Sequence, residues 1–215
     1  ESNLISGNSS VIGGGKNNTV SGGRSVLVGG SGNSVFGDEV VLVGGKNNTA
    51  SGQFVTLFAG ENNNVTGTAS TIVAGRENDI ENSDDSSIGA GTNHSMSNAK
   101  RSSINAGHDN TFLSSNDSSV AAGRNNNLTA STTSLVGAGR SNTLTNSHDS
   151  SINAGTGNSL TNSTTSLVGA GRGNVLINSN DSSINAGTGN QMTLSNKSLI
   201  GVGAGNTIES VEVSA

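Results

Sequence analysis

Apolar side chains recur along this chain with a period of 15 residues that later lengthens to 16, and they occupy fixed places within each period. When each period is numbered from a glycine at position 0, position −3 is always Ile, Leu or Val, and position +5 is always apolar. Position −5 is Ser in all but two periods, and position −1 is Gly or Ala in all but one. Constrained positions alternate with variable ones, as in a strand buried on one face. Each period therefore predicts two short strands, over −5 to −1 and +3 to +5, joined by two turns.

The glycines at position 0 show how regular the repeat is. They are Gly15, Gly30, Gly45, Gly60, Gly75, Gly91, Gly107, Gly123, Gly139, Gly155, Gly171, Gly187 and Gly203. The first four steps between them are 15 residues long, and the last eight are 16. Self-similarity at so short a period is typical of a solenoid, in which each repeat forms one rung. The sequence predicts an all-β parallel solenoid of about 13 rungs, whose activity resides in extended surfaces.

The repeat leaves room for only one domain. We expect a single solenoid over residues 1–210, with 15-residue rungs over 1–75, 16-residue rungs over 76–210 and a tail over 211–215. The shorter rungs share a glycine at position +7, which is Gly22, Gly37, Gly52 or Gly67. We expect these glycines to provide the positive φ of a tight turn, and the added residue of the longer rungs to relax that turn.

Position +3 is an asparagine column that only His94 interrupts. The asparagines are Asn3, Asn18, Asn33, Asn48, Asn63, Asn78, Asn110, Asn126, Asn142, Asn158, Asn174, Asn190 and Asn206. Because they alternate in phase with the apolar position +5, their amides should point inward, where buried polar groups need hydrogen-bond partners. We therefore predict a ladder of amides that bond between rungs and to the backbone of the turns.

Composition narrows the classes of function. Apolar residues make up 30% of the chain and charged residues 12%, which would indicate disorder without the columns and here favours a thin ordered core. A net charge of −5 argues against a nucleic-acid partner. The chain has no Cys and no apolar run of 18 residues, so we expect no disulfide, no thiolate metal site and no membrane span. Its richness in Asn, Ser and Thr suits a secreted or cell-surface protein.

No residue pattern indicates catalysis or a cofactor. The sequence around His94, His108 and His148 contains no glycine elbow or general-base cluster, and Ser is too common for its proximity to be informative. The segment GGSGNSVFG over 29–37 has Ser34 where a calcium-binding nonapeptide needs Asp. We predict that the protein is not an enzyme and has no metal or cofactor.

The outward positions +4 and +6 carry short hydroxyl or amide side chains in most rungs. Rows of hydroxyl and methyl groups at fixed spacing can order water in an ice-like array, so we assign these residues to an ice-binding face. They are Thr19, Ser21, Thr49, Ser51, Thr66, Asn127, Thr129, Thr143, Thr145, Ser159, Thr161 and Thr193. Interruptions come at Phe36, Asp79, Glu81, Val175 and Ile177. The alternative interpretation is that Thr simply suits strands and a soluble surface.

The outward positions −4 and −2 are strongly apolar in the first rungs. The residues concerned are Val26, Val28, Val41, Val43, Phe58 and Val73. A contiguous exposed apolar patch usually marks a contact surface. Self-association through this face, as a trimer or a lateral assembly, therefore stands beside ligand binding.

Charged residues gather at the two turns. Position +1 collects six of the ten cationic residues, which are Lys16, Lys46, Arg76, Arg124, Arg140 and Arg172. On the opposite turn, position −6 carries an acidic residue every 32 residues, at Asp85, Asp117, Asp149 and Asp181. One edge is thus basic and the other mildly acidic, which favours solubility or, alternatively, docking of an anionic partner.

Two families resemble parts of this sequence. The segments KNNTVSG (16–22), SGNSVFG (31–37) and ENNNVTG (61–67) resemble the xxNxVxG repeat of grass ice-recrystallisation-inhibition proteins. The segments SVLVGGSGN (25–33) and SLVGAGRGN (166–174) are similar to the head repeats of trimeric autotransporter adhesins. Both resemblances imply a left-handed parallel β-roll. The first implies ice as the partner, with antifreeze activity, and the second a cell-surface structural or adhesive module, such as an adhesin head or a filament subunit.

Overall fold

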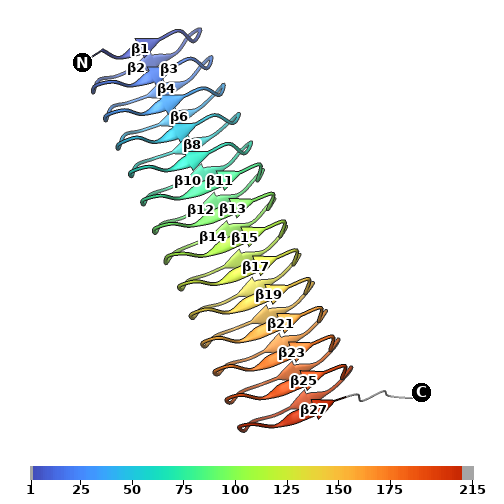
Figure 1. The fold of residues 1–215 in the computed structure, drawn as a ribbon. Coiled ribbons are helices and arrows are strands. Elements are labelled where there is room, and N and C mark those ends of the chain that lie inside the picture. The colour runs from blue at the N-terminus through green and yellow to red at the C-terminus, as the bar shows by residue number, and fades with distance from the viewer. Residues whose placement is uncertain (1, 210–215) are drawn as a thin grey trace. The chain divides into compact units, whose positions relative to one another are not determined.

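The chain forms an all-β parallel solenoid of about 13 turns, with two short strands in each rung. The computed structural model describes residues 2–209, so the expected tail over 211–215 lies outside the described part. No helix occurs within residues 2–209. The rungs form two compact units, one ending at Asp109 and one beginning at Asn110. In each unit the odd-numbered strands form one parallel sheet, which we call the odd sheet, and the even-numbered strands form the even sheet (Figure 1).

Over residues 2–109, the unit that ends at Asp109 contains 14 strands in these two sheets. Its odd sheet consists of β1 (Leu4–Ile5), β3 (Thr19–Val20), β5 (Ser34–Val35), β7 (Thr49–Ala50), β9 (Asn64–Val65), β11 (Asp79–Glu81) and β13 (Ser95–Ser97). Its even sheet consists of β2 (Val11–Ile12), β4 (Val26–Leu27), β6 (Val41–Leu42), β8 (Thr56–Leu57), β10 (Thr71–Ile72), β12 (Ser87–Ile88) and β14 (Ser103–Ile104).

The unit that begins at Asn110 has the same architecture with 16-residue rungs throughout. Its odd sheet consists of β15 (Thr111–Leu113), β17 (Asn127–Thr129), β19 (Thr143–Thr145), β21 (Ser159–Thr161), β23 (Val175–Ile177), β25 (Gln191–Thr193) and β27 (Thr207–Glu209). Its even sheet consists of β16 (Ser119–Val120), β18 (Leu135–Val136), β20 (Ser151–Ile152), β22 (Leu167–Val168), β24 (Ser183–Ile184) and β26 (Leu199–Ile200).

The thin core consists of the two aliphatic columns that the alternation predicts. Leu144 at position +5 and Ile152 at position −3 are both fully buried, and their neighbours on either side along the chain are not. Like residues stack in register, since Leu144 pairs with Leu160 and Ile152 with Val168. The even-sheet strands are shorter than predicted, because their pairing is confined to positions −4 and −3, and the odd-sheet strands of the longer rungs lie one position later than predicted, at +4 to +6.

The asparagine column points inward and forms the predicted ladder. Asn158 is fully buried, and its backbone N–H donates to Oδ1 of Asn142 at 3.1 Å. Its Nδ2 donates to the carbonyl of Gly171 in the next rung, also at 3.1 Å. Each amide thus links the rung before it to the rung after it, which satisfies polar groups that the narrow core would otherwise leave without partners.

The expected role of the glycines at position +7 is wrong. Gly22, Gly37 and Gly52 are buried, and their φ angles lie outside the left-handed region. A Cβ added at Gly37 would lie only 1.8 Å from the carbonyl oxygen of Gly52. Close approach of adjacent backbones requires these glycines, not positive φ. In the 16-residue rungs, by contrast, the residue at +7 does adopt a left-handed conformation and is not glycine, as at Asn82 with φ 48° and Leu194 with φ 53°.

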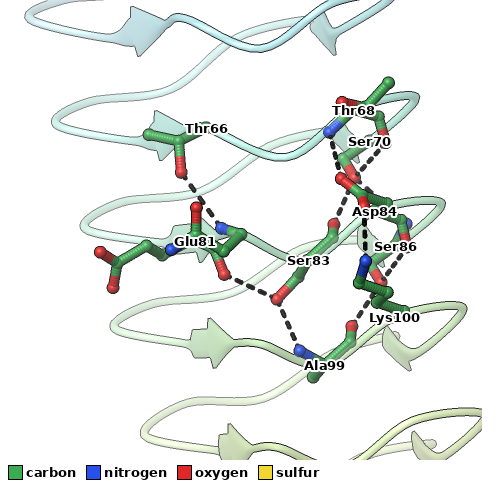
Figure 2. A network of polar contacts seen from close by, with 10 residues as sticks. Thr66, Thr68, Ser70, Glu81, Ser83, Asp84, Ser86, Ala99 and Lys100 are labelled. Carbon is green, nitrogen blue, oxygen red and sulfur yellow. Dashed lines mark hydrogen bonds and ion pairs between the residues drawn. The ribbon is translucent and has the colours of Figure 1, made fainter.

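A buried serine column replaces those glycines in the longer rungs, at position +8. Figure 2 shows its first member, Ser83, whose Oγ donates to the carbonyl of Glu81 and accepts the N–H of Ala99 in the next rung at 2.9 Å. After an interruption at Ala99, the column continues as Ser115, Ser131, Ser147, Ser163, Ser179 and Ser195, all fully buried. The sequence analysis did not identify this column, although the recurrence of Ser eight residues after the glycine signals it.

A second serine column, at position −5, is buried beside the first. Ser86 Oγ donates to the carbonyl of Ala99 at 2.6 Å (Figure 2). It also accepts the N–H of Ser102 at 3.1 Å. Each hydroxyl therefore serves as donor and acceptor between successive rungs, as a buried hydroxyl must. Inward positions are thus fixed by hydrogen bonding, and variation is left to the outward positions.

Candidate binding faces

The outward side of the odd sheet in the unit that begins at Asn110 carries most of the predicted hydroxyl face. Thr143 pairs with Ser159, and Thr145 pairs with Thr161, in the register of β19 and β21. Asn127 and Thr129 stand in register on β17 beside them. These side chains are half-buried or exposed, while the residue between the two outward residues of each strand is fully buried. The pleat and the parallel register therefore bring two rows of short polar side chains together.

Four of these hydroxyls are free of protein partners. Within the described residues, the side chains of Thr143, Thr145, Ser159 and Thr161 make no hydrogen bond to the protein. Neighbouring members of the predicted face differ, because Thr129 Oγ1 donates to Oδ1 of Asn127 at 2.9 Å and Thr193 Oγ1 accepts from Gln191 at 3.1 Å. Hydroxyls without a protein partner on an accessible face bond to water.

This face carries no charge over most of its length. Among the outward residues of β15 to β25 none is ionisable, and Glu209 at the end of β27 is the first that is. Val175 and Ile177 on β23 interrupt the hydroxyl rows with half-buried apolar side chains. The hydroxyl patch is consequently bounded on one side by β23 and extends over β17, β19 and β21.

The odd sheet of the unit that ends at Asp109 presents a less continuous hydroxyl face. Thr19 and Thr49 face outward on β3 and β7, and Ser21 and Ser51 follow these strands directly. Phe36, which is 54% exposed, separates the two rungs. The predicted set omits Ser34 and Ser95, although position +4 identifies both and the structure places them outward on β5 and β13.

Two polar side chains give the odd sheet of this unit a different chemistry from that of the hydroxyl patch described above. Thr66, which follows β9, turns its Oγ1 toward the carbonyl of Ile80 at 3.4 Å. Asp79 on β11 accepts a hydrogen bond from Asn64 at 2.8 Å. Burial raises the pKa of Asp79, the Asn64 bond opposes that rise, and the negative charge of Glu81 adds to it. A carboxylate pair thus stands within this face.

The even sheet of the unit that ends at Asp109 exposes the apolar side chains predicted for it. Val26 on β4 and Val41 on β6 stand in register. Val28 and Val43 are the first residues after these two strands. Phe58 and Val73 follow β8 and β10. Val28 is 51% exposed and Phe58 is 47% exposed, so the patch is open to solvent. These residues form a contiguous apolar surface, which we call the valine face.

The turns carry the charges. Lys46 at position +1 forms an ion pair with Glu61 in the next rung at 2.9 Å, and this pair lowers the pKa of Glu61. Lys100 pairs with Asp84 at 3.0 Å on the opposite turn (Figure 2). Within the described residues no group of three or more His, Asp or Glu side chains could hold a metal ion. Nor does that part of the chain contain a helix able to cross a membrane.

Compared with known proteins, the sequence matches no protein-family model and no curated protein.

Proposed function

We propose that this protein binds ice, and that its main ice-binding surface is the hydroxyl patch over β17, β19 and β21. The observation that carries the proposal is the in-register set of Thr143, Thr145, Ser159 and Thr161, whose hydroxyls have no protein partner in the described part of the chain. Thr19, Ser21, Thr49 and Ser51 would add a smaller patch in the other unit. Such a protein would meet ice outside the cell or at the cell surface.

The geometry supports this function through the spacing of the hydroxyls. Neighbouring parallel strands lie about 4.8 Å apart, and alternate residues of one strand lie about 6.7 Å apart. Because inward hydrogen bonds hold every rung in register, the four hydroxyls form a two-dimensional array with little freedom. Water bonded to this array would be positioned before ice is met, and it would then join the ice lattice. The threonine methyl groups would restrict that water, and the absence of charge would keep a tightly held hydration shell from forming.

The test is to block the patch sterically. Purified protein at micromolar concentration should shape growing ice crystals and slow recrystallisation. Thr143→Tyr and Thr145→Tyr should each weaken both effects, because a bulky side chain lifts the sheet off the ice surface. The matched control is Ser151→Tyr, which places the same side chain on the even sheet, on the next strand along the chain from Thr143 and Thr145. Normal crystal growth with the unmodified protein would overturn the proposal, and equal losses in the control would move the site away from the patch.

A second candidate function is self-association through the valine face, as expected of a structural or adhesive surface module. Its support is the exposure of Val26, Val28, Val41 and Val43 on one sheet of one unit, since monomeric proteins rarely expose contiguous apolar surface. Sedimentation should then show oligomers that Val28→Lys with Val43→Lys dissociates. A wild-type protein that sediments as a monomer would remove this candidate.

A further inference from the structure

The turn edge of the unit that begins at Asn110 carries an aligned set of arginines that ice binding does not use. Arg124, Arg140 and Arg172 all occupy position +1, and all are exposed. Isolated parallel bridges align Arg124 with Arg140, Arg140 with Thr156, and Thr156 with Arg172. Their backbone N–H groups donate across the rungs, to Gly139, Gly155 and Gly187. Three guanidinium groups therefore project from four consecutive rungs, whose spacing is about 4.8 Å.

These arginines differ from three of the six Lys and Arg residues of the other unit in having no acidic partner. There, Arg24 pairs with Glu39, Lys46 with Glu61 and Lys100 with Asp84, each between successive rungs. Within residues 2–209, no ion pair is formed by Arg124, Arg140 or Arg172. The aspartates of the same unit occupy position −6, on the opposite turn, as Asp117, Asp149 and Asp181. The positive charge of this edge is not neutralised locally.

The backbone at the next position, +2, is bare over the later rungs of this edge. Position +2 is glycine in four successive rungs, at Gly157, Gly173, Gly189 and Gly205, and a Cβ at any of them would meet no atom within 4 Å. Positive φ alone does not demand glycine there, because Asn125 and Ser141 adopt the same conformation with φ of 56° and 55°. From the rung of Thr156 onward these glycines leave the backbone open along the edge next to Arg172, whereas Arg124 and Arg140 are followed by Asn125 and Ser141.

We propose that this arginine edge binds a linear polysaccharide that carries carboxylate or sulfate groups. A planar guanidinium forms paired hydrogen bonds with either anion, which an ammonium group cannot do. A polymer with one anion every one or two sugar units would match arginines one and two rungs apart. Individual exposed ion pairs are weak, so several contacts along one polymer would supply the affinity.

Nucleic acid fits the edge less well. Single-stranded nucleic acid is bound by aromatic side chains on which bases stack. The chain has four Phe, no Tyr and no Trp, and the single Phe after Asp109, Phe112, is fully buried.

Binding can be measured with polygalacturonate and dextran sulfate, which separate carboxylate from sulfate recognition, against neutral dextran. We expect one or both charged polymers to bind, and binding to weaken as salt rises from about 50 mM to about 500 mM. Arg124→Gln with Arg140→Gln should lower the affinity roughly tenfold. The matched control, Arg101→Gln with Lys197→Gln, changes the net charge equally on the opposite turn and should alter affinity by less than about twofold.

Several outcomes would overturn the proposal. They are failure of both charged polysaccharides to bind, an equal loss in the control variant, and tighter binding of single-stranded DNA or of phosphatidylserine vesicles. The Arg124→Gln, Arg140→Gln variant should retain its full effect on ice crystals, because its substitutions lie on a turn and not on the hydroxyl patch. Loss of polysaccharide binding and loss of ice activity are therefore separate results.

Discussion

The asparagine ladder predicts a large destabilisation from one nearly isosteric substitution, Asn158→Leu. Asn158 Oδ1 accepts the backbone N–H of Asn174 at 3.0 Å, and both residues are fully buried. Leucine fills a similar volume but leaves that N–H without an acceptor. It also removes the bonds from Nδ2 to the carbonyls of Gly171 and Ala154, at 3.1 and 3.2 Å.

The magnitude follows from what each lost bond leaves behind. The buried N–H of Asn174 would cost about 1–3 kcal/mol, the penalty for a donor left unsatisfied. The Gly171 carbonyl loses less, about 1 kcal/mol, because it still accepts the N–H of Thr156 at 2.9 Å. Burial of the leucine side chain offsets roughly 1 kcal/mol of this loss. We therefore expect Asn158→Leu to lower the free energy of unfolding by about 1–3 kcal/mol.

Urea unfolding gives the overall change, and amide hydrogen exchange locates it. Exchange at the Asn174 N–H should accelerate strongly, whereas exchange at the Asn126 N–H, two rungs to the other side of Asn158, should change little because rungs contact only their neighbours. Asn153→Leu is the matched control, since it makes the same substitution at an exposed position of the same rung. Equal stability of the two variants, with Asn174 still protected, would refute the assignment of the ladder as the main polar support of the core.

Two further substitutions test other parts of the inward framework. Gly139→Ala should destabilise by about 3 kcal/mol or more, because Gly139 has φ 127° and its Cβ would lie 2.0 Å from the Gly155 carbonyl oxygen, whereas Gly157→Ala, with φ 66° and open space, should cost only about 1 kcal/mol in urea unfolding. Burial lowers the pKa of His94 below its usual 6.5, and the neighbouring His108 lowers it slightly further. Hydrogen bonds to the backbone of Ala90 and Gly107 and the charge of Asp109 partly oppose this decrease in the pKa. As the pH falls, the imidazole of His94 is protonated in the unfolded chain before it is protonated in the folded protein, so stability should fall below about pH 6.5. Between pH 7.5 and about pH 5, the free energy of unfolding should fall less in His94→Asn than in the unmodified protein. An equal or larger fall in the variant would contradict the reasoning.

The strand positions could be predicted from the sequence because alternation and burial are tightly coupled in a narrow core. The columns at −3, +3 and +5 hold one side-chain type each, so their inward orientation followed from period two alone. His94 was identified as the one interruption of the asparagine column. The structure places it in the ladder, where its backbone N–H donates to Oδ1 of Asn78 at 3.0 Å. The ends of the even-sheet strands were less predictable, because the recurrence of Ser at −5 from rung to rung reflects a hydrogen bond of its side chain and not strand pairing.

The turns could not be predicted because glycine has two separate uses. Glycine supplies positive φ, as at Gly139, and it also permits close backbone approach, as at Gly37. Both uses give the same letter in the sequence. In the longer rungs the left-handed residue is Asn82 in one rung and Leu194 in another, and a leucine gives no sign of that conformation. The backbone conformation is imposed there by the ladders on either side of the turn, which are contacts between rungs.

This division between inward and outward positions bears on where function can arise. The amide and hydroxyl ladders make every rung depend on the same few inward residues, so these positions have little freedom to change. Outward positions carry no such hydrogen bonds at Thr143, Thr145 and Arg140, and they can change without disturbing the register. A flat hydroxyl patch and an arginine edge can therefore lie on one unit without interfering, because the first uses a sheet face and the second a turn. The two proposed activities should accordingly be separable by substitution, as should the valine face of the other unit.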